Sequence, residues 1–170
     1  MLPPDQKYME AGESRTIPDP DQTSSEKLLF LRENMVHLTN QLSMPVIEVA
    51  LVISKYTRII IESLSKEAER SGERLPDRLL SPIPIEVNDP ESKNNFSIST
   101  FPLDDLIDMV DEDRMDILDT LIRTVVNESQ LEFIHALEEL RIWELEVRRQ
   151  LSAASGPGSL FSPILLSDDF

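Results

Sequence analysis

The chain has 170 residues, a formal net charge of -16 and no cysteine. The lack of cysteine excludes disulfide bonds, thiolate zinc sites and cysteine nucleophiles, and it is typical of a reducing, intracellular compartment. Because 32 acidic residues stand against 16 basic ones, the chain repels a phosphate backbone, so we expect no direct binding to nucleic acid. The N-terminal sequence MLPPDQKYMEAG lacks the apolar run of a secretory signal. We therefore expect a soluble intracellular protein.

Residues 1–22 hold four of the twelve prolines and few apolar residues, which predicts a disordered N-terminal tail. Thr23 and Glu26 then form the capping-box pattern of a helix start. The helix that follows, over about residues 24–43, carries apolar residues at alternating steps of three and four, the spacing of a coiled-coil seam. This first seam comprises Leu28, Leu31, Met35, Leu38 and Leu42.

A second helix is predicted over about residues 45–71, so that residues 23–71 form one helical segment with a break or kink at Pro45. The seam keeps its phase across Pro45, which favours roughly collinear helices over a tight hairpin. Apolar residues cover more than one stripe of this helix, so we expect several neighbours to bury it. Its seam residues are Val49, Ile53, Tyr56 and Ile60. Charged residues within its apolar run argue against a membrane span, namely Glu48, Lys55, Arg58 and Glu62.

Residues 72–101 are predicted to form a proline-rich linker that is partly extended, because prolines recur along it and interrupt any helix. A second helical segment is expected over residues 102–151, with a break near residue 128. Ser129 and Glu132 there form a second capping-box pattern. The last helix carries its own seam, which comprises Phe133, Leu137, Leu140, Trp143 and Val147.

Acidic residues concentrate in the first part of this second helical segment. Between Leu103 and Ser129 nine acidic residues stand against two arginines. Four of them step by four along the chain, which predicts a single stripe on one helix face: Asp104, Asp108, Glu112 and Asp116. Three interpretations remain open for this acidic stripe: a solvated face, a contact for a basic partner surface, or a divalent-cation site. The glycine of a calcium-binding loop is missing.

Motifs for catalysis are missing from the sequence. It contains no G-x-G-x-x-G, P-loop or H-E-x-x-H pattern, and it has only four glycines. His135 and Glu138 have the spacing to share one helical face, but we interpret His135 as a surface residue and His37 as a polar flank of the first seam. We therefore predict no catalytic residues, no cofactor and no metal ligands, and expect that the protein is not an enzyme.

The C-terminal residues 152–170 are predicted to be a flexible tail that mixes large apolar residues with acids. Two alternatives stay open: the tail docks in a groove of a partner, or it folds back on its own helices. The docking residues would be Phe161, Ile164, Leu165, Leu166 and Phe170. Ser81 and Ser162 precede prolines and Ser167 precedes two aspartates, so these three serines are candidate phosphorylation sites.

Together these patterns predict an all-α protein: a helical bundle or elongated coiled-coil arrangement of three to four helices, with disordered termini and a proline-rich linker. We expect a non-enzymatic structural or adaptor subunit of a multiprotein complex, which assembles with other protein chains through its helical seams as a hetero- or homo-oligomer. The alternative is an acidic regulatory protein, cellular or viral, that oligomerises through its helices and modulates a basic partner through its tails.

Overall fold

The computed structural model describes residues 16–85, 103–153 and 157–170, and these residues are mostly helical, with no strand among them. This confirms the all-α prediction for the described part of the chain. The helices are α2 (Ser24–Gln41), α3 (Val46–Ser71), α4 (Asp77–Leu80), α5 (Leu103–Met109), α6 (Glu112–Ser129), α7 (Phe133–Ser152) and α8 (Pro157–Leu160). None of these helices is long and apolar enough to cross a membrane.

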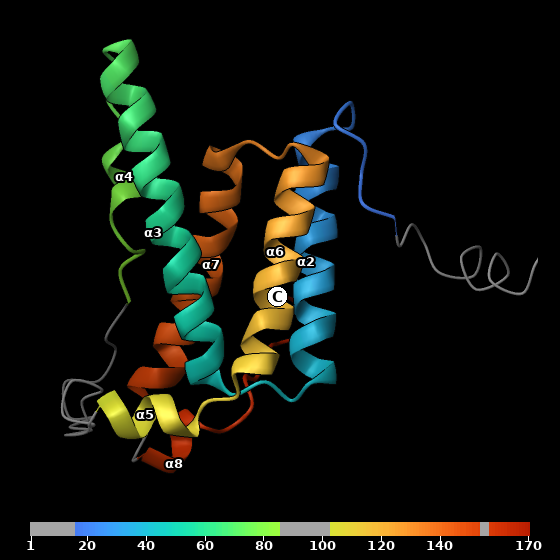
Figure 1. The fold of residues 1–170 in the computed structure, drawn as a ribbon, viewed down its shortest axis with the longest axis vertical. Helices are drawn as coiled ribbons and strands as arrows, with labels where there is room; N and C mark the ends of the chain where they lie inside the picture. Colours follow the sequence, from blue (N-terminus) through green and yellow to red (C-terminus); the bar gives the residue numbers. More distant parts are fainter. Residues whose placement is uncertain (1–15, 86–102, 154–156) are drawn as a thin grey trace, which may run out of the picture.

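The four long helices stand side by side, while α5 lies across the lower end of the molecule (Figure 1). α3 packs most extensively on α7 and also packs on α6, and α2 packs on both α6 and α7. In Figure 1, α2 and α7 run downward, whereas α3 and α6 run upward. Consecutive helices α2 and α3 therefore occupy opposite corners, and each is flanked by helices from the other half of the chain.

The predicted seams supply most of the core between these helices. Leu31, Met35 and Ile53 are fully buried, as are Leu137 and Leu140. Every other seam residue is buried or half-buried except Phe133, whose ring lies partly in solvent. Burying one such aliphatic side chain contributes roughly 1.5–3 kcal/mol. The seams are thus covered by helices of the same chain.

The chain reverses between α2 and α3, so the prediction of collinear helices across Pro45 is wrong. Ser43 takes a left-handed backbone conformation with φ 47°. The amide of Ser43 donates to the carbonyl of Asn40 at 3.2 Å, and the amide of Met44 donates to the carbonyl of Thr39 at 2.9 Å. These two bonds form a Schellman motif, which ends α2 and turns the chain. Met44 follows the turn and is fully buried, which fixes the direction of the reversal.

The reversal between α6 and α7 uses the same motif. Gln130 has φ 53°, its amide donates to Asn127, and the amide of the buried Leu131 donates to the carbonyl of Val126. The predicted capping box of Ser129 and Glu132 is wrong. The Ser129 hydroxyl instead donates to the carbonyl of Val125 at 2.6 Å, and Glu132 makes no side-chain cap bond. At the start of α2, by contrast, the Thr23 hydroxyl accepts from the Glu26 amide at 3.2 Å, as predicted.

A break between α5 and α6 was not predicted. Asp111 caps α6, because its carboxylate accepts from the amides of Asp113 at 3.0 Å and Arg114 at 3.2 Å. The predicted acidic stripe is therefore divided: Asp104 and Asp108 belong to α5, whereas Glu112 and Asp116 belong to α6. The expectation of one continuous stripe on a single helix is wrong.

Several segments outside the long helices pack on them. α4 lies against α7, where the buried Arg141 donates to the carbonyl of Leu79 and Arg148 donates to that of Ile83. Ahead of α2, Lys27 donates to the carbonyl of Pro20 at 2.9 Å. The rest of the predicted tail and linker, residues 1–15 and 86–101, lies outside the described residues.

The Gln130→Gly substitution is expected to raise the free energy of unfolding by about 1 kcal/mol, because glycine adopts the left-handed conformation without the strain of a Cβ. Chemical denaturation measures this change. The matched control is Glu128→Gly within α6, which should lower the same free energy by about 0.5–1 kcal/mol. Equal destabilisation by both glycines would show that Gln130 does not occupy this turn conformation.

Candidate functional site

The junction of α5 and α6 is held in place by a buried carboxylate of α3. The Glu48 side chain is fully buried, and it accepts two hydrogen bonds from the Arg114 guanidinium, at 2.9 and 2.8 Å. It also accepts from the backbone amide of Asp111 at 3.2 Å. A bidentate, charge-assisted contact of this kind fixes orientation as well as distance. Glu48 thereby sets where α5 ends and α6 begins, and it neutralises the arginine of the junction.

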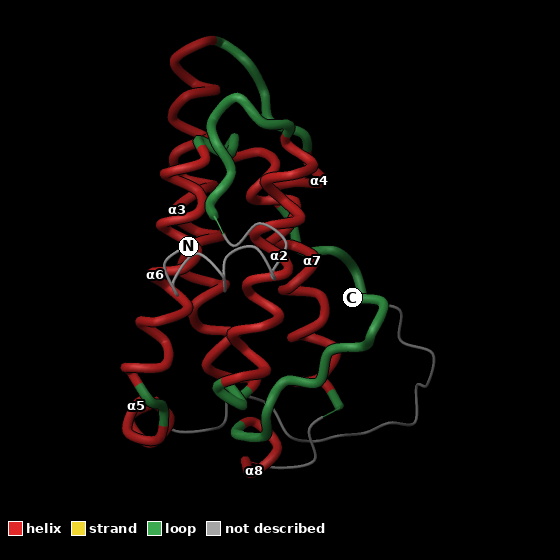
Figure 2. Tube along the Cα trace, turned by 90° about the vertical axis from the view of Figure 1, so that its right-hand side faces the viewer, coloured by secondary structure: helices red, strands yellow, loops and turns green. Residues whose placement is uncertain are grey.

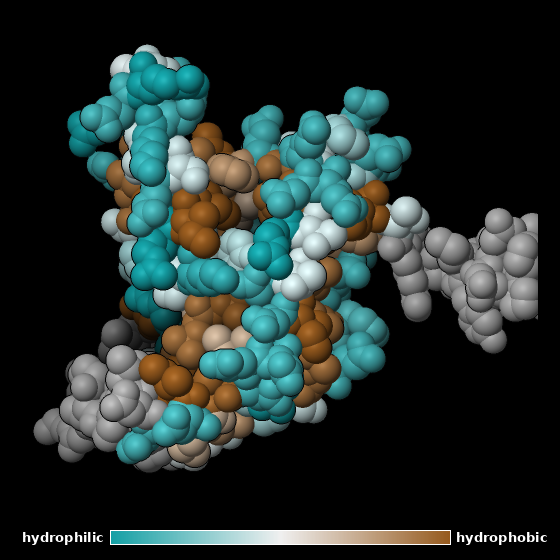
Figure 3. All heavy atoms as spheres, in the orientation of Figure 1, coloured by the Kyte–Doolittle hydropathy of each residue, from teal (hydrophilic) through white to brown (hydrophobic). Residues whose placement is uncertain are grey.

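Once Arg114 is engaged by Glu48, no other basic side chain of the described residues pairs with the exposed carboxylates of this junction. We name it the acidic elbow, defined by five exposed carboxylates, which form no ion pair among the described residues, and three exposed apolar side chains. Its carboxylates are Asp105, Asp108, Glu112, Asp113 and Asp116, and its apolar residues are Ile107, Met109 and Ile117. Figure 3 shows hydrophobic atoms gathered beside α5 and the start of α6.

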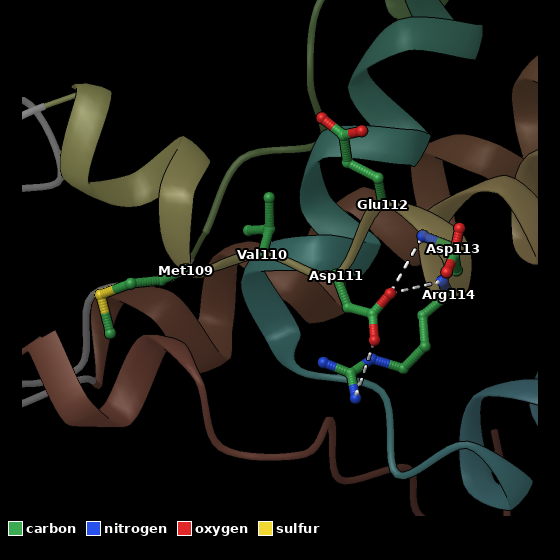
Figure 4. Close-up of a pocket in the computed structure, with 6 residues that line it drawn as sticks. All are labelled: Met109, Val110, Asp111, Glu112, Asp113 and Arg114. Carbon is green, nitrogen blue, oxygen red and sulfur yellow. Dashed lines mark hydrogen bonds and ion pairs between the residues drawn. The ribbon is translucent and has the colours of Figure 1, made fainter.

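An open cleft of about 540 Å³ lies at the bend of the acidic elbow, lined by Met109 to Arg114 (Figure 4). In this view the Met109 side chain and the Glu112 carboxylate extend away from the capping bonds of Asp111. The cleft therefore offers an apolar contact beside acceptors with free lone pairs, which suits the aliphatic stem and charged end of a lysine or arginine. In the described part of the chain, no three acidic or histidine side chains converge as metal ligands do.

A second hollow of about 260 Å³ lies between α3 and α6, near the start of α7. Tyr56 and Ile60 of α3 and Val126 of α6 are its buried apolar walls, and the partly exposed Ile59 and Phe133 lie at its rim. Lys55 and Arg123 line its edges. Figure 3 shows hydrophobic atoms between α3 and α6 in the upper half of the molecule. We name this hollow the α3–α6 groove.

An ion-pair network under the α3–α6 groove orders its basic residues. The largely buried Asp119 accepts from Lys55 and, at 2.6 Å, from the Tyr56 hydroxyl, while Arg123 lies 3.8 Å away. Burial alone raises the pKa of Asp119, but the hydrogen bonds from Lys55 and Tyr56 and the nearby positive charges outweigh it, so the pKa lies below the usual value. Burial and the bond to Asp119 raise the pKa of Tyr56.

The C-terminal residues 157–170, which we name the strap, pack on the helices of the same chain (Figure 2). The amide of Ile164 donates to the carbonyl of Met44 at 2.9 Å, and the amide of Val46 donates to the carbonyl of Ser162 at 3.0 Å. Gln150 of α7 exchanges two hydrogen bonds with the backbone of Leu165. The strap thus ties the turn between α2 and α3 to α7.

The end of the strap reaches another ion pair, in which the carboxylate of Glu139 is buried. The Phe170 ring meets Trp143 edge to face, with ring centroids 4.8 Å apart, and Arg32 lies over the same ring. Glu139 accepts two 2.7 Å bonds from Arg32 and one from the Trp143 indole. Of the predicted docking residues, Phe161, Leu166 and Phe170 are half-buried against the chain, Ile164 is 4% exposed and Leu165 is 76% exposed. Their docking on a partner stays a prediction.

The remaining candidate residues lie apart from one another. His135 is 3.6 Å from Glu132 rather than paired with Glu138, and His37 is exposed on α2. The three candidate phosphorylation sites Ser81, Ser162 and Ser167 are exposed. Their modification stays a prediction.

Comparisons with known proteins add no assignment. No protein-family model, no curated protein and no solved structure matches the chain. The function of the protein is therefore inferred from its own surfaces.

The Asp119→Asn variant is expected to lower the free energy of unfolding at pH 7 by about 1–3 kcal/mol, because it removes the negative charge that pairs with Lys55 and replaces one of the two acceptor oxygens with an NH2 donor. Since the pKa of Asp119 is lower in the folded than in the unfolded chain, its contribution is present above about pH 4 and is lost as pH falls through the folded value. Chemical denaturation at pH 7 and at pH 3 measures both the loss of stability in the variant and its dependence on pH. The difference from the native chain should shrink at pH 3, whereas the exposed Asp116→Asn should differ little at either pH. A difference independent of pH would contradict the ion pair.

The Ile164→Ala substitution is expected to lower the free energy of unfolding by about 2–4 kcal/mol, because it leaves a cavity where the strap meets the core. Its neighbour Leu165 is largely exposed, so Leu165→Ala should change the same quantity by less than about 0.5 kcal/mol. Thermal or chemical denaturation of the two variants measures the contrast. Equal, small effects would mean that the strap does not pack on its own helices in solution.

Proposed function

We propose that the protein is a non-enzymatic adaptor subunit that docks a basic, partly apolar segment of a partner protein on its acidic elbow. The observation that carries the proposal is the placement of five carboxylates, unpaired among the described residues, next to three exposed apolar side chains. Exposed apolar residues surrounded by charge are typical of protein interaction sites. The negative charge would attract a basic segment from a distance, and the apolar residues would hold it.

The buried charges support a structural rather than a catalytic role. Glu48, Asp119 and Glu139 each pair with a basic residue of a different helix. Each carboxylate is therefore already occupied in joining two helices, as expected of groups that fix helix packing. The seams now serve as the core of the same chain, so in this proposal the partner binds the exposed elbow rather than the seams.

The alternative of an acidic regulator that acts through its tails has less support. The described C-terminal strap is engaged with Met44, Val46, Gln150 and Trp143 of its own chain. A tail that binds a partner would first have to leave these contacts. The acidic elbow needs no such rearrangement.

Fluorescence anisotropy with a synthetic amphipathic peptide tests the docking proposal. The peptide carries leucines on one face and lysines on the other. We expect binding that weakens as salt rises, because salt screens the attraction to the exposed carboxylates. The double variant Asp108→Asn with Asp113→Asn should weaken binding about fivefold. This factor corresponds to about 1 kcal/mol, the summed free energy of two exposed ion pairs.

The matched control removes the same amount of charge elsewhere, by Glu33→Gln with Glu69→Gln, two exposed residues of α2 and α3. This control should leave the affinity within about twofold of the native chain. Equal losses in the two double variants would show that the peptide responds to net charge alone, and the elbow proposal would then fail.

A further inference from the structure

The α3–α6 groove has the opposite electrostatic character to the acidic elbow. Lys55 and Arg123 line its edges, and Asp119 beneath it compensates for only one of these two positive charges. On a chain with a net charge of -16, a hollow edged by two basic side chains is an exception. The groove therefore disfavours the basic segment that suits the elbow.

The shape of the α3–α6 groove favours side chains of a helix over a small molecule. Its volume of about 260 Å³ lies below the roughly 300–1,000 Å³ of typical small-molecule pockets. Its walls are residues between Lys55 and Ile60 of α3 and between Arg123 and Asn127 of α6, two helices that point the same way in Figure 1. A third helix laid on two such helices inserts apolar side chains spaced three or four residues apart.

Two apolar side chains at the rim of the groove are exposed, and a third helix would cover them. Ile59 is 43% exposed, although its neighbours Tyr56 and Ile60 on the same helix are buried. Phe133, from the start of α7, approaches the same rim and is exposed to a similar degree. A helix seated between them would bury both side chains, with Lys55 and Arg123 at its flanks.

We propose that the α3–α6 groove is a second docking site, and that its occupant is an amphipathic helix of a partner with carboxylates beside its apolar residues. The carboxylates pair with Lys55 and Arg123, and the apolar residues enter between Ile59 and Phe133. Together with the acidic elbow, this site would let one chain join two partner segments of opposite charge.

The chain's overall negative charge opposes an acidic partner at long range, while Lys55 and Arg123 attract it at contact. Salt near 0.15 M screens interactions beyond about 8 Å, so it reduces the long-range repulsion more than the contact pairs. The affinity of the groove is therefore expected to stay the same or to rise, and not to fall, between about 0.02 and 0.15 M salt. Binding at the elbow is instead expected to weaken over the same range of salt.

The test uses a labelled helix-forming peptide of about four turns, with leucines at helical spacing along one face. Glutamates flank its leucines, and a second peptide carries lysine in place of every glutamate. Fluorescence anisotropy with the full chain measures both affinities. We expect Ile59→Asp to weaken binding of the glutamate peptide at least tenfold, and Arg123→Gln to weaken it about threefold.

Two controls separate the groove from the rest of the surface. Ile142→Asp places the same charge at an apolar residue of α7 with similar exposure, 37%, and should leave the affinity unchanged. The elbow variant Asp108→Asn with Asp113→Asn should not weaken binding of the glutamate peptide, so failure at one site is distinguishable from failure at the other. Ile59→Ser, which adds no charge, serves if the melting temperature shows that Ile59→Asp is not folded.

Four results would overturn the proposal. The first would be that the glutamate peptide does not bind. The second would be that the lysine peptide binds more tightly than the glutamate peptide and that this binding depends on Ile59. The third would be that Ile59→Asp and Ile142→Asp weaken binding of the glutamate peptide equally. In the fourth, sedimentation of the chain alone shows a dimer that Ile59→Asp dissociates, which would assign the groove to a second copy of the chain.

Discussion

The structure depends on covering α3, whose apolar residues spread over most of its circumference. Seven apolar residues between Val46 and Ile60 are buried, and in the first turn they lie on more than one side of the helix, so one neighbour cannot shield it. α7 covers one side, α6 covers another, and the strap crosses its first turn through Ile164. The same turn buries Glu48, and a buried carboxylate is tolerated only with a partner, which brings Arg114 and the start of α6 to this end of the molecule. The position of the acidic elbow follows from that pairing.

Much of the core was predictable from the sequence, whereas the path of the chain was not. Helical spacing predicts which residues are buried, but it does not show which helix covers them. The residues predicted in this way include Leu31, Met35, Leu137 and Leu140. The seam keeps its heptad phase across Pro45, which wrongly favoured collinear helices, because two helices can reverse direction and still turn the same face inward. Both reversals use residues other than glycine, Ser43 and Gln130, at the left-handed position, so the usual sequence signal was missing. The remaining clue was an apolar residue directly after each, Met44 and Leu131.

The candidate sites divide in the same way. The acidic excess after residue 103 was visible in the sequence, but which carboxylates remain unpaired depends on Glu48 and Arg114, which are 66 residues apart. Asp111 was not distinguished as a helix cap because acids surround it on both sides. The α3–α6 groove combines Lys55 and Ile59 with Arg123 and Phe133, residues that no local pattern connects. Hydrophobic periodicity thus identified core residues: the seam residues pack within the chain, and partner binding by them stays a prediction. The residues that we propose bind partners are instead exposed apolar residues beside charge.

The helices of one chain cover the apolar stripes of one another, so that the core residues of α3 are buried without a partner. Amide hydrogen exchange of the isolated chain, at a concentration where sedimentation shows a monomer, measures whether α3 is protected without a partner. We expect slow exchange along α2, α3, α6 and α7, with protection in the middle of α3 approaching that of global unfolding. Rapid exchange throughout α3 in the monomer, with protection gained only after a second chain is added, would contradict it.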